Sequence, residues 1–382
     1  MERCGKCVLP LQFVKHDRKK ICIHCQDAET KAEVDWTAKQ KTFDDMIHSF
    51  HGRGQRYDFL VTVTGGKDST FVLYYLTKVL GISRILAFTW DHLFHRKASW
   101  ENMRKAIAAT QVDFIAYQII DAETTRAIHR ALFRKFGYTC TVCFLLQSAV
   151  ILNQAIRHEV PFIVSGRTPG QAYLRGTNVQ GPISPRQEVH DRLGIFTYVL
   201  RKALSDEIGK RRTEVVLEEI LGGISQGLKQ ENFSWPYYVD MGAYLNWYRE
   251  DECSLLRTLS NSLGFQKPSN TLTHTSCHLE KVRGYQEYNF PKVDKTGYSA
   301  ELSHFVRSGI LSRQEALGEL EKLGMTQTLP DEVNDYVREV GLTVEEFNRR
   351  VRQPLPFFIK SYFLRVAATR KLRGIFKKKQ QE

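Results

Sequence analysis

The chain has 382 residues, of which 42% are hydrophobic and 25% charged, so it can bury one large core or two smaller ones. No stretch approaches the roughly 18 consecutive apolar residues of a membrane-spanning helix, and the first residues lack the apolar segment of a secretory signal, so we expect a cytoplasmic protein. The net charge of +13 is local: residues 349–382 hold eleven Lys or Arg and one acid, which leaves 44 basic and 41 acidic residues elsewhere. A uniformly basic nucleic-acid-binding protein is therefore not indicated.

Two CxxC pairs lie at the start of the chain. Cys4 and Cys7 are followed, after 14 intervening residues, by Cys22 and Cys25. Pairs at this separation are typical of a closed Zn²⁺ site with four thiolate ligands, and a module this short needs the metal to fold. We therefore predict a zinc-binding module over residues 1–30. Apolar residues at helical spacing then predict a helical connector over 31–56.

Residues 57–70 predict a buried strand, a glycine turn and the start of a helix. The two glycines allow a tight turn and the close approach of a ligand. Backbone N–H groups at such a turn and at a helix N-terminus form an anion site, and the side chains that follow add donors. The spacing is shorter than that of the Gly-x4-Gly-Lys-Ser/Thr phosphate loop. The candidate phosphate-binding residues are Thr64, Gly65, Gly66, Lys67, Asp68, Ser69 and Thr70.

Three further strands are predicted at 84–89, 113–119 and 161–166, with helical segments between them. This alternation indicates a parallel sheet with helices on both faces, in which ligands bind beyond the carboxyl ends of the strands. Residues after those ends are candidates for nucleotide contact. Trp90 could stack on adenine or simply pack in the core, and Asp91 could bind the ribose or a metal. After the fourth strand and Gly166, Arg167 could neutralise phosphate.

A third CxxC pair, Cys140 and Cys143, follows the helix after the third strand, and Cys277 lies far along the chain. Together they could hold an iron–sulfur cluster of the 4Fe–4S type or a second metal. They could equally be zinc ligands together with His274 or His278, or buried core cysteines, and their spacing leaves these alternatives open. Cys253 has no partner in sequence, and we interpret it as a structural residue in an acidic loop.

Beyond the core, assigned to residues 57–175, the pattern weakens. We assign 176–348 to a substrate-side and helical C-terminal region, with helices at 255–263, 299–323 and 331–340. In residues 349–382 apolar and cationic residues interleave at near-helical spacing. Such a tail is typical of a helix at an anionic membrane surface, of an RNA-contacting arm, or of a helix packed on the protein itself. The first interpretation would place the protein at the inner face of the membrane.

The loop Thr64–Ser69 matches the Ser/Thr-Gly-Gly-x-Asp-Ser signature of PP-loop ATP pyrophosphatases. From Cys4 to about Asn348 the chain resembles the N-acetyl sugar amidotransferases of that superfamily. The segments that carry this resemblance are the first CxxC pair running into Pro10, Asp35-Trp36, Tyr57-Asp58, Phe136-Gly137 before Cys140, Arg283-Gly284-Tyr285 after Cys277, and Ser312–Ala316.

The resemblance implies a parallel α/β, Rossmann-like (HUP-like) core that uses ATP and Mg²⁺. In these enzymes ATP adenylates the acetamido carbonyl oxygen of a sugar, and ammonia from a separate glutaminase displaces AMP to leave an acetamidine, as a step in surface-polysaccharide (LPS O-antigen) biosynthesis. Lys67 would face the departing pyrophosphate, Asp68 would hold Mg²⁺ or orient the loop, and Ser69 would bind phosphate oxygens. These three are the predicted catalytic residues.

Two alternatives remain. A PP-loop sulfur transferase would use a cysteine-ligated cluster to deliver sulfide to tRNA or to an amide, and nucleic acid would then be a partner. A non-catalytic scaffold would keep the nucleotide fold without turning ATP over.

Overall fold

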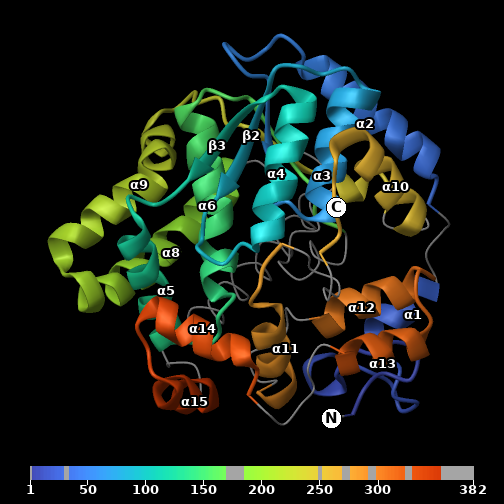
Figure 1. The fold of residues 1–382 in the computed structure, drawn as a ribbon, viewed down its shortest axis with the longest axis vertical. Helices are drawn as coiled ribbons and strands as arrows, with labels where there is room; N and C mark the ends of the chain where they lie inside the picture. Colours follow the sequence, from blue (N-terminus) through green and yellow to red (C-terminus); the bar gives the residue numbers. More distant parts are fainter. Residues whose placement is uncertain are drawn as a thin grey trace, which may run out of the picture.

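The computed structural model describes residues 2–29, 34–168, 185–247, 252–268, 276–290, 298–322 and 329–353. Its centre is a five-stranded parallel sheet in the order β3-β2-β1-β4-β5 (Figure 1). The strands are β1 (Phe59–Thr62), β2 (Ile85–Trp90), β3 (Asp113–Tyr117), β4 (Phe162–Ser165) and β5 (Tyr237–Asp240). The first four confirm the predicted strands, and the order is that of a doubly wound, Rossmann-like fold.

The strand β5 is absent from the prediction. It is a four-residue edge strand that pairs in parallel with β4, with Ser165 opposite Asp240. Its two tyrosines are half-buried and Val239 and Asp240 are buried, so its burial does not alternate and gives no period-two signal. The core sheet therefore includes residues well beyond 175.

Side chains of the central strands alternate between two apolar clusters. Phe59 and Val61 pack on one face, whereas Leu60 and Phe88 pack on the other. The helices of the first face are α2 (Trp36–Phe50), α3 (Lys67–Tyr74), α4 (Lys97–Thr110) and α10 (Glu252–Leu263). Those of the second are α5 (Ala122–Phe136), α6 (Thr141–Arg157), α8 (Pro185–Ile208) and α9 (Lys210–Lys229). Burial on both faces explains why the strands are nearly continuous apolar runs.

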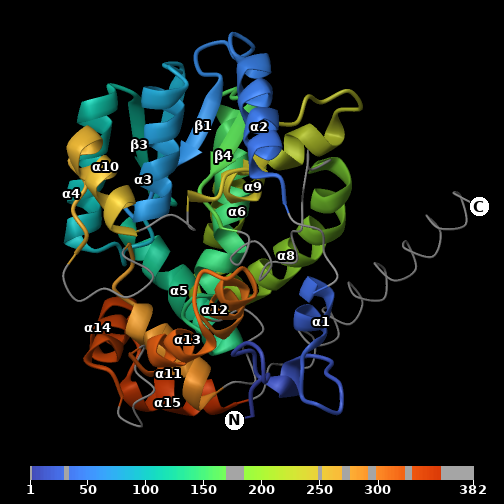
Figure 2. The same cartoon turned by 90° about the vertical axis from the view of Figure 1, so that its right-hand side faces the viewer.

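The C-terminal part of the described chain forms a separate helical layer beside the carboxyl ends of the strands, and the N-terminal module with α1 (Ile23–Glu29) lies against it (Figures 1 and 2). Its helices are α11 (Glu280–Asn289), α12 (Tyr298–Arg307), α13 (Arg313–Lys322), α14 (Asp331–Val340) and α15 (Val344–Arg352). Short 3-10 turns lie at η1 (Leu11–Phe13) and η3 (Met241–Ala243), and η2 (Tyr75–Val79) is a π-helical segment that continues α3.

The helix predicted over 299–323 is divided into α12 and α13. Just after α12 ends, the chain turns at Gly309, which has a φ of 70°. Ser312 then begins α13 with a capping box, because the Glu315 N–H donates to Ser312 Oγ (3.1 Å) and the Ser312 N–H donates to Glu315 Oε2 (2.7 Å). The Ser-x-x-Glu pattern in the sequence is the signal that would have placed this boundary.

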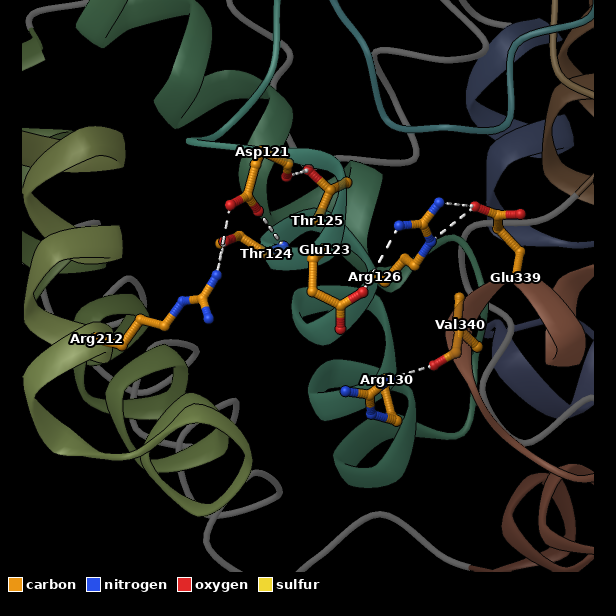
Figure 3. A network of polar contacts seen from close by, with 9 residues as sticks. All are labelled: Asp121, Glu123, Thr124, Thr125, Arg126, Arg130, Arg212, Glu339 and Val340. Atoms are coloured by element: carbon orange, nitrogen blue, oxygen red, sulfur yellow. Dashed lines mark hydrogen bonds and ion pairs between the residues drawn. The ribbon is translucent and has the colours of Figure 1, made fainter.

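Helix α5 attaches the helical layer to the core (Figure 3). Arg126 Nε donates to Glu339 Oε1 (2.9 Å), and Arg130 Nη1 donates to the carbonyl oxygen of Val340 (2.6 Å) at the end of α14. On its other side, Arg212 of α9 donates to the first turn of α5. The two arginines of α5 therefore join the core to the helical layer, whereas Arg212 joins two helices within the core.

No helix in the described ranges is both long and apolar enough to cross a bilayer. Of the predicted basic tail, residues 354–382 lie outside the described residues.

Candidate functional site

A cavity of about 260 Å³ lies at the carboxyl ends of the strands. Its lining comes from the loop after β1, the ends of β2 and β4, the start of α6, the residues around Cys277, and helices α11 and α12. The predicted site residues in this lining are Thr64, Gly66, Lys67, Asp68, Ser69, Trp90, Gly166, Arg167, Cys140, Cys143 and Cys277. Segments more than 200 residues apart in sequence thus meet around one space.

Two glycines allow the loop to take its path. Gly65 has φ of 69°, and a Cβ there would lie 2.0 Å from the carbonyl oxygen of Ser99. A Cβ on Gly166 would lie 2.9 Å from the carbonyl oxygen of Asp68, because the end of β4 passes directly against the loop. Gly65 does not line the cavity but sets the backbone that does.

The loop is closed by its own hydroxyl groups. Ser69 Oγ accepts from the Thr64 N–H (3.0 Å) and donates to the carbonyl oxygen of Gly66 (3.1 Å). Thr70 is buried and donates to the same carbonyl (2.9 Å), so it supports the loop from behind the cavity. A side chain that bridges both ends of the loop holds it in one conformation.

Asp68 is held by two donors on one oxygen. Lys67 Nζ lies 2.8 Å from Asp68 Oδ1, and Trp247 Nε1 lies 3.0 Å from it. Trp247 is almost fully buried and stacks on Phe71 at 5.1 Å, so it is a rigid donor. Sequence reasoning does not single out Trp247, because its position in an aromatic-rich segment gives no indication of a partner in the loop.

The two residues predicted to contact the nucleotide after β2 differ in placement. Trp90 is 5% exposed and lines the cavity, and its indole N–H has no hydrogen-bond partner among the described atoms. Asp91 does not line the cavity. Its carboxylate accepts from the Leu93 N–H (3.0 Å) and from Gln118 Nε2 (2.9 Å), so it stabilises the turn after β2.

The wall opposite the loop comes from the helical layer and is strongly polar. Glu280, Arg283, Tyr298 and Glu301 line the cavity, and each is at most 9% exposed. The Arg283 guanidinium lies 4.1 Å from the centre of the Tyr298 ring, and Arg96 Nη2 lies 3.4 Å from Glu280. These residues are absent from the predicted site. Most of α11 is buried although it is polar, so it shows no amphipathic stripe to draw attention to it.

Two histidines complete the lining. The His92 and His95 ring centroids are 4.2 Å apart, and His95 Nε2 lies 3.1 Å from the carbonyl oxygen of Trp90. Burial lowers the pKa of both imidazoles. Behind them, burial lowers the pKa of His129 to about 3. All three are therefore neutral near pH 7.

Cys140, Cys143 and Cys277 are partly exposed to the same cavity, and burial raises the pKa of Cys277 to about 12. Within the described ranges they do not form, with each other or with a His or carboxylate, a group of three ligand atoms within 4.8 Å. Their present spacing therefore does not fit a single metal ion. Cys253 lies exposed on α10, so its predicted position in a loop is wrong.

The N-terminal cysteines form such a tight group. Cys4, Cys7, Cys22 and Cys25 are at most 3% exposed, and their sulfur atoms all lie within 4.8 Å of one another. Hydrogen bonding to Cys22 and Cys7, together with burial, raises the pKa of Cys25 well above that of an ordinary thiol. Four crowded, buried sulfurs with no cation are costly as thiolates, and they fit a tetrahedral metal ion.

No protein-family model and no curated protein sequence matches the chain. Among solved structures, it is similar to an ammonia-dependent NAD synthetase from Campylobacter jejuni (14% identity, TM-score 0.29, covering 60% of this chain and 94% of that one). It is also similar to the U34-tRNA thiolase NcsA from Methanococcus maripaludis with its 4Fe–4S cluster (14% identity, TM-score 0.31, covering 89% of this chain and 97% of that one). A third similar structure is an NMN synthetase from Francisella tularensis (10% identity, TM-score 0.25, covering 52% of this chain and 95% of that one). Since these TM-scores are below 0.5, the description of the fold rests on the molecule itself: a parallel α/β fold with a four-cysteine module before it and a helical region after it.

Proposed function

We propose that the chain is an ATP-dependent amidotransferase that converts the acetamido group of a sugar, free or nucleotide-linked, into an acetamidine. The observation that carries the proposal is the composition of one cavity. Loop residues suited to a triphosphate line one side, and buried carboxylates, an arginine and a tyrosine line the other. An enzyme that joins ATP to a second substrate needs both surfaces around one space.

The acceptor side favours a hydroxyl-rich molecule. Glu280 and Glu301 are 4% and 3% exposed, and Tyr298, on the same helix as Glu301, packs its ring against Arg283 of α11. Carboxylates accept hydrogen bonds from sugar hydroxyls, and an aromatic ring packs against the apolar face of a sugar.

The proposed reaction has two steps. The acetamido carbonyl oxygen attacks the α-phosphorus of ATP, and the bond to pyrophosphate breaks. Ammonia then attacks the activated carbon, and AMP leaves with the original carbonyl oxygen while the nitrogen loses a proton to give the acetamidine. Lys67 and the loop N–H groups stabilise the charge on pyrophosphate, and the N–H of Trp247 and the ammonium of Lys67 orient Asp68.

Two metals belong to this proposal. Asp68 is the carboxylate in the loop that would hold Mg²⁺, which supplies charge neutralisation to the phosphates when bound. The four N-terminal cysteines would hold Zn²⁺ as a structural ion, at about one per chain. A separate glutaminase is the proposed ammonia source, and the basic tail is proposed to meet an anionic membrane surface.

Isotope labelling tests the reaction directly. The purified chain is incubated with MgATP, ammonium and a panel of nucleotide-linked N-acetyl sugars that carry ¹⁸O in the acetyl carbonyl. We expect AMP and pyrophosphate in equal amounts, with ¹⁸O in the AMP. Label that appears in pyrophosphate, or AMP formed without label, would exclude carbonyl adenylation.

A sulfur transferase is the second candidate, because Cys140, Cys143 and Cys277 line the reaction cavity. Three thiolates can hold an iron–sulfur cluster, whose core separates its ligands more widely than a single ion does. Iron and sulfide analysis of anaerobically purified protein separates the candidates. Bound iron with sulfide-dependent AMP formation favours sulfur, whereas iron-free protein with ammonium-dependent AMP formation favours nitrogen.

A further inference from the structure

Helix α12 contacts two sites at once. Tyr298 and Glu301, in its first half, line the cavity. At its other end, Val306 packs on the cluster of N-terminal cysteines, and Arg307 Nη1 lies 3.7 Å from Cys7 Sγ. The helix has only ten residues, so the cysteine module and the cavity wall share one short rigid element.

The connection to the module continues into the next helix. Arg313, at the start of α13, donates from Nε to the carbonyl oxygens of both Cys4 and Cys7, each at 3.2 Å. These two carbonyls belong to the first pair of metal-ligating residues. Arg313 therefore fixes the backbone of the CxxC turn, while Arg307 reaches a ligand sulfur.

The start of α12 is joined to the module by a third arginine. Arg3 donates to the carbonyl oxygen of Val8 (2.6 Å) and to Ser299 Oγ (3.0 Å). The Val8 side chain is fully buried and packs against Tyr298 and Leu302. The ring that lines the cavity thus rests directly on the module.

Charge explains why these contacts depend on the metal. A divalent ion with four thiolates carries a net charge of about −2, and partners outside the ligand shell compensate that charge and orient the ligands. Without the ion, the four sulfurs no longer form this compact anionic centre beside Arg307, whose Nη1 lies 3.7 Å from Cys7 Sγ. Arg307 then loses its anionic partner, and α12 loses a charge-assisted contact at its C-terminal end.

We propose that the metal in the four-cysteine module positions the acceptor wall of the cavity, with Arg307 and Arg313 as the positioning residues between metal and α12. The proposal rests on the metal site proposed above but not on the identity of the acceptor. At its other end α12 is held by Glu287 of α11, whose carboxylate accepts from the N–H groups of Tyr298 and Ser299. Loss of the metal therefore loosens the module's contacts with both ends of α12, and Glu287 alone still holds its first residues, including the Tyr298 that lines the cavity.

The test uses the full chain loaded with Zn²⁺ or Co²⁺ and reads hydrogen–deuterium exchange in residues 298–307, with 59–62 of β1 as internal reference. Removal of the metal by a chelator should raise exchange in α12 about tenfold and leave β1 unchanged. Arg307→Met should keep the four-thiolate Co²⁺ absorption with shifted bands, bind metal roughly tenfold more weakly, and exchange faster in α12. Arg307→Lys should restore most of each effect, and Arg338→Met, on exposed α14 surface, should change none.

Two negative results have different meanings. Protein purified without tightly bound metal refutes the metal site itself. Bound metal, combined with α12 exchange that changes neither on chelation nor in Arg307→Met, overturns the positioning role while leaving the metal site and the proposed reaction intact.

Discussion

The two sides of the cavity are built in different ways. The nucleotide side is one contiguous segment, Thr64–Ser69, on a strand, turn and helix of the core sheet. The acceptor side brings together Cys140, the Cys277 segment and residues of α11 and α12. A phosphate site made of backbone N–H groups needs a local turn, whereas a site that fits one particular acceptor needs side chains from several elements. Changes on the two sides should therefore separate ATP chemistry from acceptor use.

The largest expected effect is on the nucleotide side. Asp68→Ala removes the carboxylate that pairs with Lys67 and Trp247, and should lower AMP formation about 10²–10³-fold, the cost of losing one preorganised electrostatic group. The measurement is AMP release from MgATP in the presence of ammonium and the acceptor panel. Asp45→Ala, which removes an exposed acid of α2, should retain the parental rate. An Asp68→Ala protein that is folded, by circular dichroism, and still makes AMP at the parental rate would remove Asp68 from the mechanism.

The shape of the loop can be tested with two glycines of similar backbone conformation. Gly65→Ala places a Cβ 2.0 Å from the Ser99 carbonyl oxygen, so the loop must move and ATP affinity should fall at least tenfold. Gly81→Ala, also at positive φ but with open space around it, should cost only about 1–2 kcal/mol of stability and no ATP affinity. Titration calorimetry with a non-hydrolysable ATP analogue and thermal unfolding measure the two quantities. Equal ATP affinity in both variants would contradict the proposed loop geometry.

A change on the acceptor side should weaken use of the acceptor and leave ATP binding unchanged. Glu301→Gln removes a buried charged acceptor from the wall and should raise the KM for the acceptor about tenfold, as expected for a lost hydrogen bond to a charged group. The Kd for ATP should stay unchanged. Glu321→Gln, on the exposed surface of α13, is the matched control. A Glu301→Gln enzyme that loses ATP affinity instead would show that the two sides are not separate.

The smallest expected effect is on the pH dependence of the free energy of unfolding. His129 is 1% exposed and contacts the rings of Phe94 and Tyr336, and burial lowers its folded-state pKa to about 3. Between pH 6.5 and 3 the unfolded chain binds a proton at this residue that the folded chain does not. The free energy of unfolding should therefore fall as pH is lowered, by up to about 1.4 kcal/mol per pH unit.

His129→Leu should show a weaker decrease than the parent in urea unfolding at pH 7, 6 and 5, whereas His48→Gln, at an exposed position, should follow the parent. The neighbouring His92 shares the same direction of pKa change and keeps part of the decrease in the variant. Identical slopes for parent and His129→Leu would show that this imidazole is not held neutral by burial.

The success of the sequence predictions also differs between the nucleotide side and the acceptor side of the cavity. The glycine loop, the four-cysteine module and α14 are predicted well, because each has a local signal: a turn, a fixed ligand spacing, or an amphipathic stripe ended by Gly341. The strand β5 has no alternation, and the polar helix α11 is buried over most of its surface, so neither has a local signal. Asp91 follows a strand, as predicted for a nucleotide contact, but both of its carboxylate oxygens accept hydrogen bonds that stabilise the turn after β2.

The central claim is that the loop after β1 binds the triphosphate of ATP with its α-phosphorus open to the wall formed by α11 and α12. A crystal structure with a non-hydrolysable ATP analogue and Mg²⁺ tests it most directly. The expected result is phosphates against Thr64–Ser69 and an empty acceptor space bounded by Glu280, Tyr298 and Glu301. Phosphates bound elsewhere, or a base that fills the acceptor space, would contradict the account.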